Sequence, residues 1–298
     1  LHPIYVAIGG RGVQGMDTNE DDFVEHLIST STHDTILFFT NKGKVYKAKG
    51  YEVPEFGRTA KGIPIINMLQ VEKGEWVNAV ISVSEYNEDA YLFFTTKHGI
   101  AKRTQLSHFA NIRKGGIIAL SLKENDELIS VKLTDGNQEV FIATKQGYLI
   151  RFEETQVRAM GRSAAGVKGI SLRDDDEVVS MEIIQENSKI LHVTSNGFGK
   201  KTKVEEYRRI NRGGKGVLTC KINEKTGHVV AVKAVFGNED LMVMTAHGVL
   251  IRMPVADISE TGRNAMGVVL IRLQEGQEVA TVTKIDHEAE EEKESDMD

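Results

Sequence analysis

Basic residues recur at two fixed offsets from glycine along this 298-residue chain. One set follows the glycine of an expected hairpin by four residues: Lys47, Arg103, Arg151, Lys201 and Arg252. The other set precedes a second glycine series by four residues: Arg58, Arg162, Arg212 and Arg263. Cations at regular spacing can bind the phosphates of a polyanion. Each could instead be the solvated end of an exposed strand, but the shared register favours a functional ring of positive charge.

The second glycine series has a period near fifty residues: Gly12, Gly62, Gly116, Gly166, Gly216 and Gly267. Such a period is typical of propeller-like arrays, in which one repeat cannot bury its hydrophobic face alone. The hairpin glycines interleave with it: Gly43, Gly99, Gly147, Gly197 and Gly248. Each follows an apolar run that ends in threonine, such as ILFFT (36–40). This pattern predicts a strand entering a tight turn, with glycine at positive φ.

The expected fold is all-β: a six-bladed β-propeller or β-pinwheel of four-stranded repeats, each about 50 residues long. We expect one domain over residues 1–285 and a disordered acidic tail over residues 286–298. The first strands of the first blade are expected to be missing upstream, so its closure stays open.

The charge of the chain is divided unevenly. Residues 286–298 hold eight acidic residues and one lysine, so subtracting their −7 from the net −6 leaves about +1 for the rest. The tail could compete with a polyanion for the basic surface. The single cysteine, Cys220, excludes an internal disulfide and fits a reducing cytoplasm. No apolar run reaches membrane-spanning length, so we expect a cytoplasmic protein with no membrane partner.

Catalytic and metal-binding patterns are missing from the sequence. The nine histidines are scattered, and none stands at a metal-ligand spacing from Cys, Asp or Glu. Asp174, Asp175 and Asp176 fit a polar hairpin turn as well as a cation site. IYVAIGGRGVQG (4–15) imitates a dinucleotide-binding fingerprint, but no alternation of helices and parallel strands follows it. We therefore expect no catalytic residue, no metal and no cofactor.

The basic positions are expected to lie on the outside of a closed disc, at similar heights in successive repeats. A basic perimeter without aromatic stacking platforms favours phosphate contacts with duplex DNA, steep salt dependence and little sequence preference. The predicted DNA-binding residues are Gly9, Gly10, Arg11, Gly12, Lys42, Lys44, Lys47, Arg58, Lys61, Lys102, Arg103, Arg113, Lys114, Arg151, Arg162, Lys200, Lys201, Arg208, Arg212, Lys215, Arg252 and Arg263.

The chain closely resembles the C-terminal domains of DNA gyrase A subunits, from Gly9 to about Ile285. The resemblance is carried by residues 20–55, by RSAAGVKGISL (162–172), NGFGKKT (196–202) and GRNAMGVVLIRL (262–273), and by the acidic tail. It implies a six-bladed pinwheel whose blades exchange strands and whose rim wraps duplex DNA. It also implies a non-catalytic part of an ATP-dependent type II topoisomerase that introduces negative supercoils.

The family's basic box, Q-[RK]-R-G-G-[RK]-G, is only half present, as residues 9–12. Val6, Ala7 and Ile8 stand where the family has Gln and two basic residues, and NRGGKG (211–216) is a degenerate copy. This departure puts full wrapping in doubt and leaves DNA binding expected. Ile112 is a second gap in the arginine register, and Arg113 could replace it one residue later.

The resemblance implies three partners: duplex DNA, the N-terminal part of the gyrase A subunit, and the gyrase B subunit. The isolated domain is expected to be a monomer. Two alternatives stay open. One is the matching domain of topoisomerase IV, although the surviving GGRG favours gyrase. The other is a propeller that serves as a protein-interaction scaffold, in which the basic residues only aid solubility.

Overall fold

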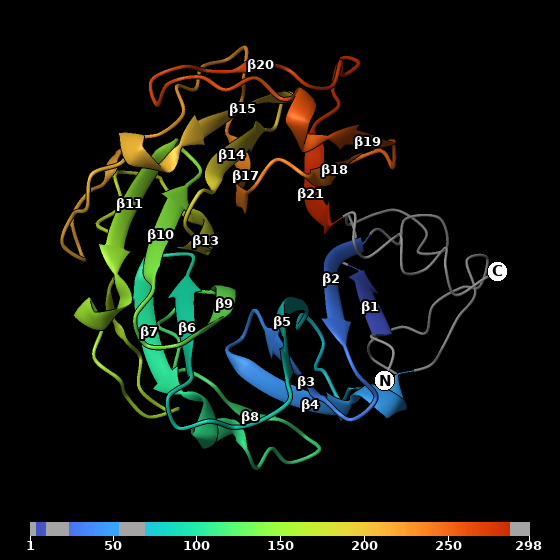
Figure 1. The fold of residues 1–298 in the computed structure, drawn as a ribbon, viewed down its shortest axis with the longest axis vertical. Coiled ribbons are helices and arrows are strands. Elements are labelled where there is room, and N and C mark those ends of the chain that lie inside the picture. Colours follow the sequence, from blue (N-terminus) through green and yellow to red (C-terminus); the bar gives the residue numbers. More distant parts are fainter. Residues whose placement is uncertain (1–3, 10–23, 54–68, 287–298) are drawn as a thin grey trace.

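A ring of small antiparallel sheets makes up the protein (Figure 1). The structure is a computed structural model that describes residues 4–9, 24–53 and 69–286. Five sheets have three or four strands, and we name them blades A to E in chain order. None of the helices in the described residues is long and apolar enough to cross a membrane.

Within each blade the strands run in order from the centre of the ring to its rim. Blade A is β5 (Val77–Val83), β3 (Thr35–Thr40), β4 (Lys44–Lys49) and β8 (Ile117–Ile118). Blade B is β9 (Leu128–Thr134), β6 (Tyr91–Thr96), β7 (Ile100–Gln105) and β12 (Val167–Lys168). Blade C is β13 (Val178–Ile184), β10 (Glu139–Thr144), β11 (Tyr148–Glu153) and β16 (Val217–Leu218). Blade D is β17 (Val229–Val235), β14 (Lys189–Thr194), β15 (Phe198–Lys203) and β20 (Val268–Val269). Blade E has three strands: β21 (Val279–Asp286), β18 (Glu239–Thr245) and β19 (Leu250–Pro254).

The predicted count of six blades is wrong, because the described residues form five. Between blades E and A stands a two-stranded sheet of β1 (Ile4–Gly9) and β2 (Val24–Thr30). β2 contacts both β21 and β5, so it takes the place of an innermost strand in the ring (Figure 1). Within the described residues this sheet has two strands, half of what blades A to D have, so it does not count as a four-stranded blade. The all-β propeller with four-stranded blades is confirmed.

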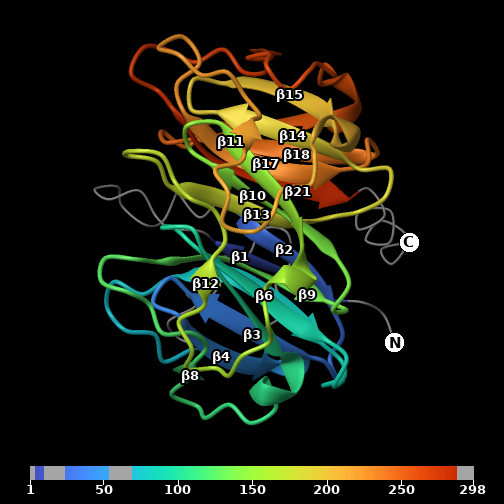
Figure 2. The same ribbon diagram turned by 90° about the vertical axis from the view of Figure 1, so that its left-hand side faces the viewer.

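Neighbouring repeats exchange their outermost strands. The outer strand β8 follows β7 of blade B in the chain but pairs with β4 of blade A, and β12, β16 and β20 behave in the same way. Figure 2 shows the ring from its side, where β8 and β12 follow one another along the rim. The exchange ties each blade covalently to the next.

Short 3₁₀ turns join the hairpins to the rim: η1 (Gly50–Glu52), η2 (Leu106–Phe109), η3 (Glu154–Gln156), η4 (Val204–Glu206) and η5 (Val255–Asp257). The predicted hairpin turns are confirmed. All five hairpin glycines have positive φ, and each donates its N–H to the threonine that ends the preceding strand. Position 147 requires glycine for a second reason as well. A Cβ there would lie 2.2 Å from the Cys220 carbonyl oxygen.

The hydrophobic core lies between blades rather than on one side of a sheet. All six residues of β3 are buried, because its two faces pack against different neighbours. Phe39 meets Phe94 of blade B edge-to-face, with ring centroids 5.6 Å apart. Phe38, on the opposite face of β3, belongs to a separate cluster. A strand buried on both faces reads as a continuous apolar run, which explains sequences such as ILFFT.

Candidate nucleic-acid interface

Exposed cations gather on the turns that lead to the outer strands. Arg113 and Lys114 precede β8, and Arg208 and Lys215 precede β16; all four side chains are exposed. The outer strands themselves contain no aromatic residue. This part of the rim can therefore meet phosphates but offers no stacking platform for bases.

Three further rim cations lie outside the predicted register. Lys168 in β12 is exposed, and so are Lys221 and Arg272, each five residues after a glycine of the fifty-residue series. The repeat signal missed them because most other repeats have no basic residue at these offsets. A search of the sequence for any lysine or arginine close to an expected outer strand, whatever its offset, would have found them.

The arginines of the Arg-x-x-x-Gly turns are half-buried at the rim. Arg162 Nη1 donates to the Ile118 carbonyl at 3.1 Å, Arg212 Nη1 to the Lys168 carbonyl at 2.9 Å, and Arg263 Nη1 to the Leu218 carbonyl at 2.8 Å. The glycines that close these turns, Gly166, Gly216 and Gly267, have positive φ as the turn requires. These guanidinium groups lie at the perimeter but are bonded to protein.

In blades B to D, the cations four residues after the hairpin glycines do not form the expected outer belt. The side chains of Arg103 and Arg151 are only 11% and 12% exposed, and Lys201 is 6% exposed. Each side chain crosses to the 3₁₀ turn of the next blade. Arg103 Nε donates to the Val157 carbonyl at 2.9 Å, and Lys201 Nζ donates to the Val255 carbonyl at 2.9 Å.

Arg151 follows the same pattern. Its Nη1 donates to the carbonyls of Val204 and Tyr207 at 3.2 and 3.1 Å, and its Nη2 pairs with Glu139 at 2.7 Å. Arg151 and Arg209 together lower the pKa of the Glu139 carboxyl, against the effect of its burial. The expectation of outward projection is therefore wrong for these three residues, because neighbouring blades cover that side of the strand.

Two predicted contacts are fully buried lysines. Lys102 Nζ donates to the carbonyls of Ala119 and Arg162 at 2.6 and 2.5 Å. Lys200 Nζ donates to the carbonyls of Gly262 and Arg263 at 2.8 and 2.9 Å. Burial lowers the pKa of Lys102 to about 7 and that of Lys200 to about 8. Neither ammonium group reaches the surface.

The two end blades differ from the middle ones. In blade A, Lys42 and Lys47 are exposed, whereas Lys44 is half-buried with its Nζ 3.8 Å from a Glu72 carboxylate oxygen. In blade E, Arg252 is exposed and its Nε lies 2.7 Å from an Asp240 carboxylate oxygen. The position four residues after the hairpin glycine is therefore accessible only at the two ends of the blade series.

Of the box residues 9–12, Gly10, Arg11 and Gly12 lie outside the described residues, as do Arg58 and Lys61. Gly9 ends β1, and Ile8 lies in that strand opposite His26. β1 pairs antiparallel with β2, and Val24–Thr30 is a strand. A dinucleotide fingerprint needs a helix and a parallel strand after its glycines, so this arrangement does not support one.

The described residues hold no group of His, Cys, Asp and Glu able to bind a metal ion. Asp176 accepts the N–H groups of Gln146 and Glu177 in a turn, as the polar-turn interpretation predicts. His192 is fully buried beside Thr219, and burial lowers its pKa to about 3. Cys220 follows β16 rather than lying within a strand, and burial raises its thiol pKa.

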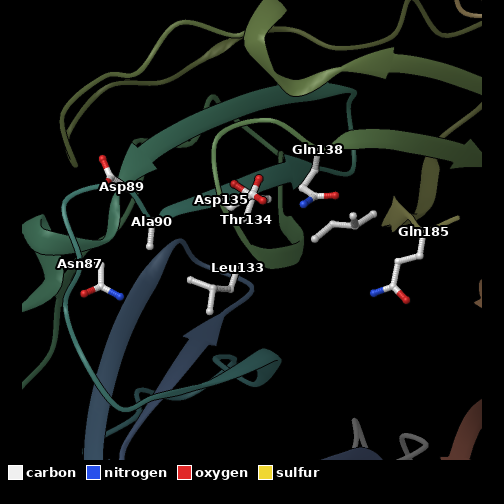
Figure 3. Close-up of a pocket in the computed structure, with 9 residues that line it drawn as sticks. Asn87, Asp89, Ala90, Leu133, Thr134, Asp135, Gln138 and Gln185 are labelled. Carbon is white, nitrogen blue, oxygen red and sulfur yellow. The ribbon is translucent and has the colours of Figure 1, made fainter.

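Cavities lie both between blades and at the rim of the described part of the chain. One of about 470 Å³ lies between blades B and C and is lined by Asn87, Asp89, Ala90, Leu133, Thr134, Asp135, Gln138, Ile183 and Gln185. Figure 3 shows its labelled side chains, none of them basic. The second, of about 290 Å³, is lined by Glu206, Arg208, Val217 and Arg263 and lies at the rim. Of these two cavities, the one at the rim is lined by cations.

Comparison with known proteins identifies the fold and the family. The model of the family described as "DNA gyrase C-terminal domain, beta-propeller" matches residues 5–31, 34–84, 90–135, 138–185, 188–235 and 239–286. The DNA gyrase A subunit of Halalkalibacterium halodurans is 67% identical over 283 residues, which cover 95% of this chain and 34% of that protein. The corresponding protein of Streptococcus pneumoniae is 59% identical over 278 residues, covering 93% of this chain and 34% of that protein. The chain thus spans about a third of the length of these curated relatives.

Solved structures agree with this assignment. A crystal structure of the C-terminal domain of DNA topoisomerase IV has a TM-score of 0.84 at 25% identity, covering 96% of this chain and 94% of that one. A structure of a DNA gyrase A C-terminal domain has a TM-score of 0.77 at 26% identity, covering 94% and 92%. The family model and the sequence identities decide between the two, and the chain belongs to the family of C-terminal domains of DNA gyrase A subunits.

Proposed function

We propose that this chain binds duplex DNA along its rim and bends it, without catalysing a reaction of its own. The observation that carries the proposal is the series of exposed cations beside successive outer strands, Arg113 and Lys114 at β8, Lys168 in β12, and Arg208 and Lys215 at β16. Membership of the gyrase family supports it. Positive charge spaced along a curved perimeter fits a bent duplex, and sequence-independent phosphate contacts dominate such binding.

The energy needed for bending sets how many contacts are required. Bending a 20–30 bp site by 40–90° costs roughly 1–6 kcal/mol by elastic estimates. Several phosphates neutralised together can offset that cost. One or two neutralised phosphates are not expected to offset it. We assign the phosphate contacts to the exposed cations rather than to Lys102, Lys200 or Lys201, which are buried.

Within a complete gyrase, the rim would present bent DNA to the N-terminal part of the A subunit. Together with the B subunit, the enzyme would use ATP to introduce negative supercoils. These roles concern the whole protein, of which the chain spans about a third. They rest on relatives that are DNA gyrase A subunits. The isolated domain is proposed to be a monomer.

Binding to a long linear duplex over a range of salt concentrations tests the proposal. We expect binding that weakens steeply with salt and depends little on sequence. No binding at low salt would contradict it and favour a protein-interaction scaffold.

Ligation of nicked circles in the presence of the domain then tests wrapping. Constrained positive writhe is expected for a gyrase-type domain. The triple substitution Val6→Gln, Ala7→Arg and Ile8→Arg restores the box pattern and should increase the constrained writhe. An unchanged value would show that the box does not govern wrapping in this chain.

A further inference from the structure

Three arginines make the same contact between consecutive blades. The donor always stands in the turn before an outer strand, and the acceptor is the second residue of the preceding outer strand. Arg162, before β12, reaches Ile118 of β8; Arg212, before β16, reaches Lys168 of β12; Arg263, before β20, reaches Leu218 of β16. We call these three hydrogen bonds the rim clamps. They link four outer strands in an unbroken series.

At two of the clamps, a buried lysine donates a hydrogen bond to the backbone carbonyl of the clamp arginine. Lys102 donates to the backbone carbonyl of Arg162 and also to that of Ala119. Arg162 itself holds the carbonyl of Ile118, so the two cations bind adjacent carbonyls at the end of the same outer strand. Lys200 holds the carbonyl of Arg263 in the corresponding way. A fully buried lysine cannot touch DNA, so its role here is to fix the turn.

The middle clamp is held differently. Ile150 stands in blade C where Lys102 and Lys200 stand in blades B and D. Without a lysine, this turn is fixed by Gln156. Its side-chain oxygen accepts the Arg212 N–H at 2.7 Å, as a Glu206 carboxylate oxygen accepts the Arg263 N–H at 3.1 Å, and its carbonyl accepts Arg212 Nε at 3.1 Å. The arginine-to-carbonyl bond is kept although its surroundings differ. This constancy indicates that the clamp, not the lysine, is the common feature.

We propose that Arg162, Arg212 and Arg263 are positioning residues for DNA bending, which hold successive outer strands at a fixed spacing. The exposed cations beside those strands then meet successive phosphates of one bent duplex. The proposal rests on the proposed DNA-binding function. The arginines act through the strands they join, because each guanidinium is already bonded to a backbone carbonyl of the neighbouring blade.

The test separates positioning from phosphate contact by two readouts. The clamp variant carries Arg162→Gln, Arg212→Gln and Arg263→Gln, and the matched control carries Lys114→Gln, Arg208→Gln and Lys215→Gln. Both lose three charges. The first readout is the slope of log K against log salt on a duplex too short to cross several blades. The second is the end-to-end distance of a duplex of about 40 bp, measured by energy transfer at saturating protein.

Positioning predicts opposite outcomes for the two variants. The clamp variant should keep the wild-type salt slope on the short duplex but bend the long duplex less. The control should reduce the steepness of the slope, by about 0.9 for each phosphate contact that the short duplex loses. A clamp variant whose slope falls in the same way while it bends DNA normally would overturn the proposal. So would a clamp variant unchanged in both readouts.

Melting curves show whether the clamp variant is folded. If it is not, Lys102→Met and Lys200→Met are measured singly, since neither lysine is accessible to DNA. A folded Met variant should show weaker bending at an unchanged salt slope, and normal bending would overturn the proposal. If the wild-type chain itself shows no salt-dependent binding, the proposed function fails before the clamps are compared.

Discussion

Neutralising the exposed rim should reduce DNA affinity by an amount that the salt dependence makes measurable. Arg113→Gln, Lys114→Gln, Arg208→Gln and Lys215→Gln together remove four exposed cations beside β8 and β16. The slope of log K against log salt is negative, and each lost phosphate contact reduces its magnitude by about 0.9. The expected reduction for four contacts is about 3.6. Fluorescence anisotropy with a labelled linear duplex at several salt concentrations measures the slope.

A control with the same charge change tests whether location matters. The control variant lacks four other exposed cations: three in loops and one at the end of β15. It carries Lys73→Gln, Lys123→Gln, Lys225→Gln and Lys203→Gln. These positions lie away from the turns before the outer strands, so the slope should fall much less. Equal slopes for the two quadruple variants would refute a localised rim. The interaction would then be a general attraction between DNA and any exposed cation.

Three further predictions concern stability and the tail. Because the folded-state pKa of Lys102 is about 7, well below its ordinary 10.5, the unfolded chain binds more protons between these values. The free energy of unfolding should therefore rise with pH in that window, by up to about 1.4 kcal/mol per pH unit, and Lys102→Met should remove this contribution in urea titrations. Gly147→Ala should cost at least about 2 kcal/mol, since its φ is +93° and the Cys220 carbonyl is in the way, whereas Gly161→Ala, with open space, should be nearly neutral in the same titrations. Deleting the acidic tail, residues 286–298, should tighten DNA binding at fixed salt, and an unchanged affinity would exclude competition by the tail.

The repeat pattern predicted most of the fold because it reports local backbone requirements. Glycines at positive φ and apolar runs ending in threonine located each hairpin, and every such run is a strand. The number of blades was wrong for a different reason. A blade needs four paired strands, and pairing depends on neighbours that the glycine register does not describe. β1 and β2 pair with each other, but the described residues add no third strand to them.

The candidate site was only partly predictable, because a propeller blade buries both of its faces. In an exposed sheet, alternation along a strand separates a buried side from a solvated side. In blades B to D, the alternate side of the second hairpin strand faces the next blade instead of water. Arg103, Arg151 and Lys201 therefore donate to backbone carbonyls across the blade interface. The sequence shows that cations are required there, and it does not show whether their acceptor is a phosphate or a carbonyl.

The two isoleucines that interrupt the arginine register acquire a structural meaning from the rim clamps. Ile112 is 5% exposed and packs in the core cluster between blades A and B, so its position is occupied by a hydrophobic contact. Arg113 does not replace the missing clamp, since its side chain is exposed and makes no hydrogen bond to an outer strand within the described residues. Ile8, the other gap, lies in β1. The clamped series thus runs from β8 to β20, and both unclamped register positions precede it in the chain, Ile8 in β1 and Ile112 before β8. The spacing of the rim is fixed by arginine where four-stranded blades follow one another, and it must be set by other contacts where β1 and β2 stand between blades E and A.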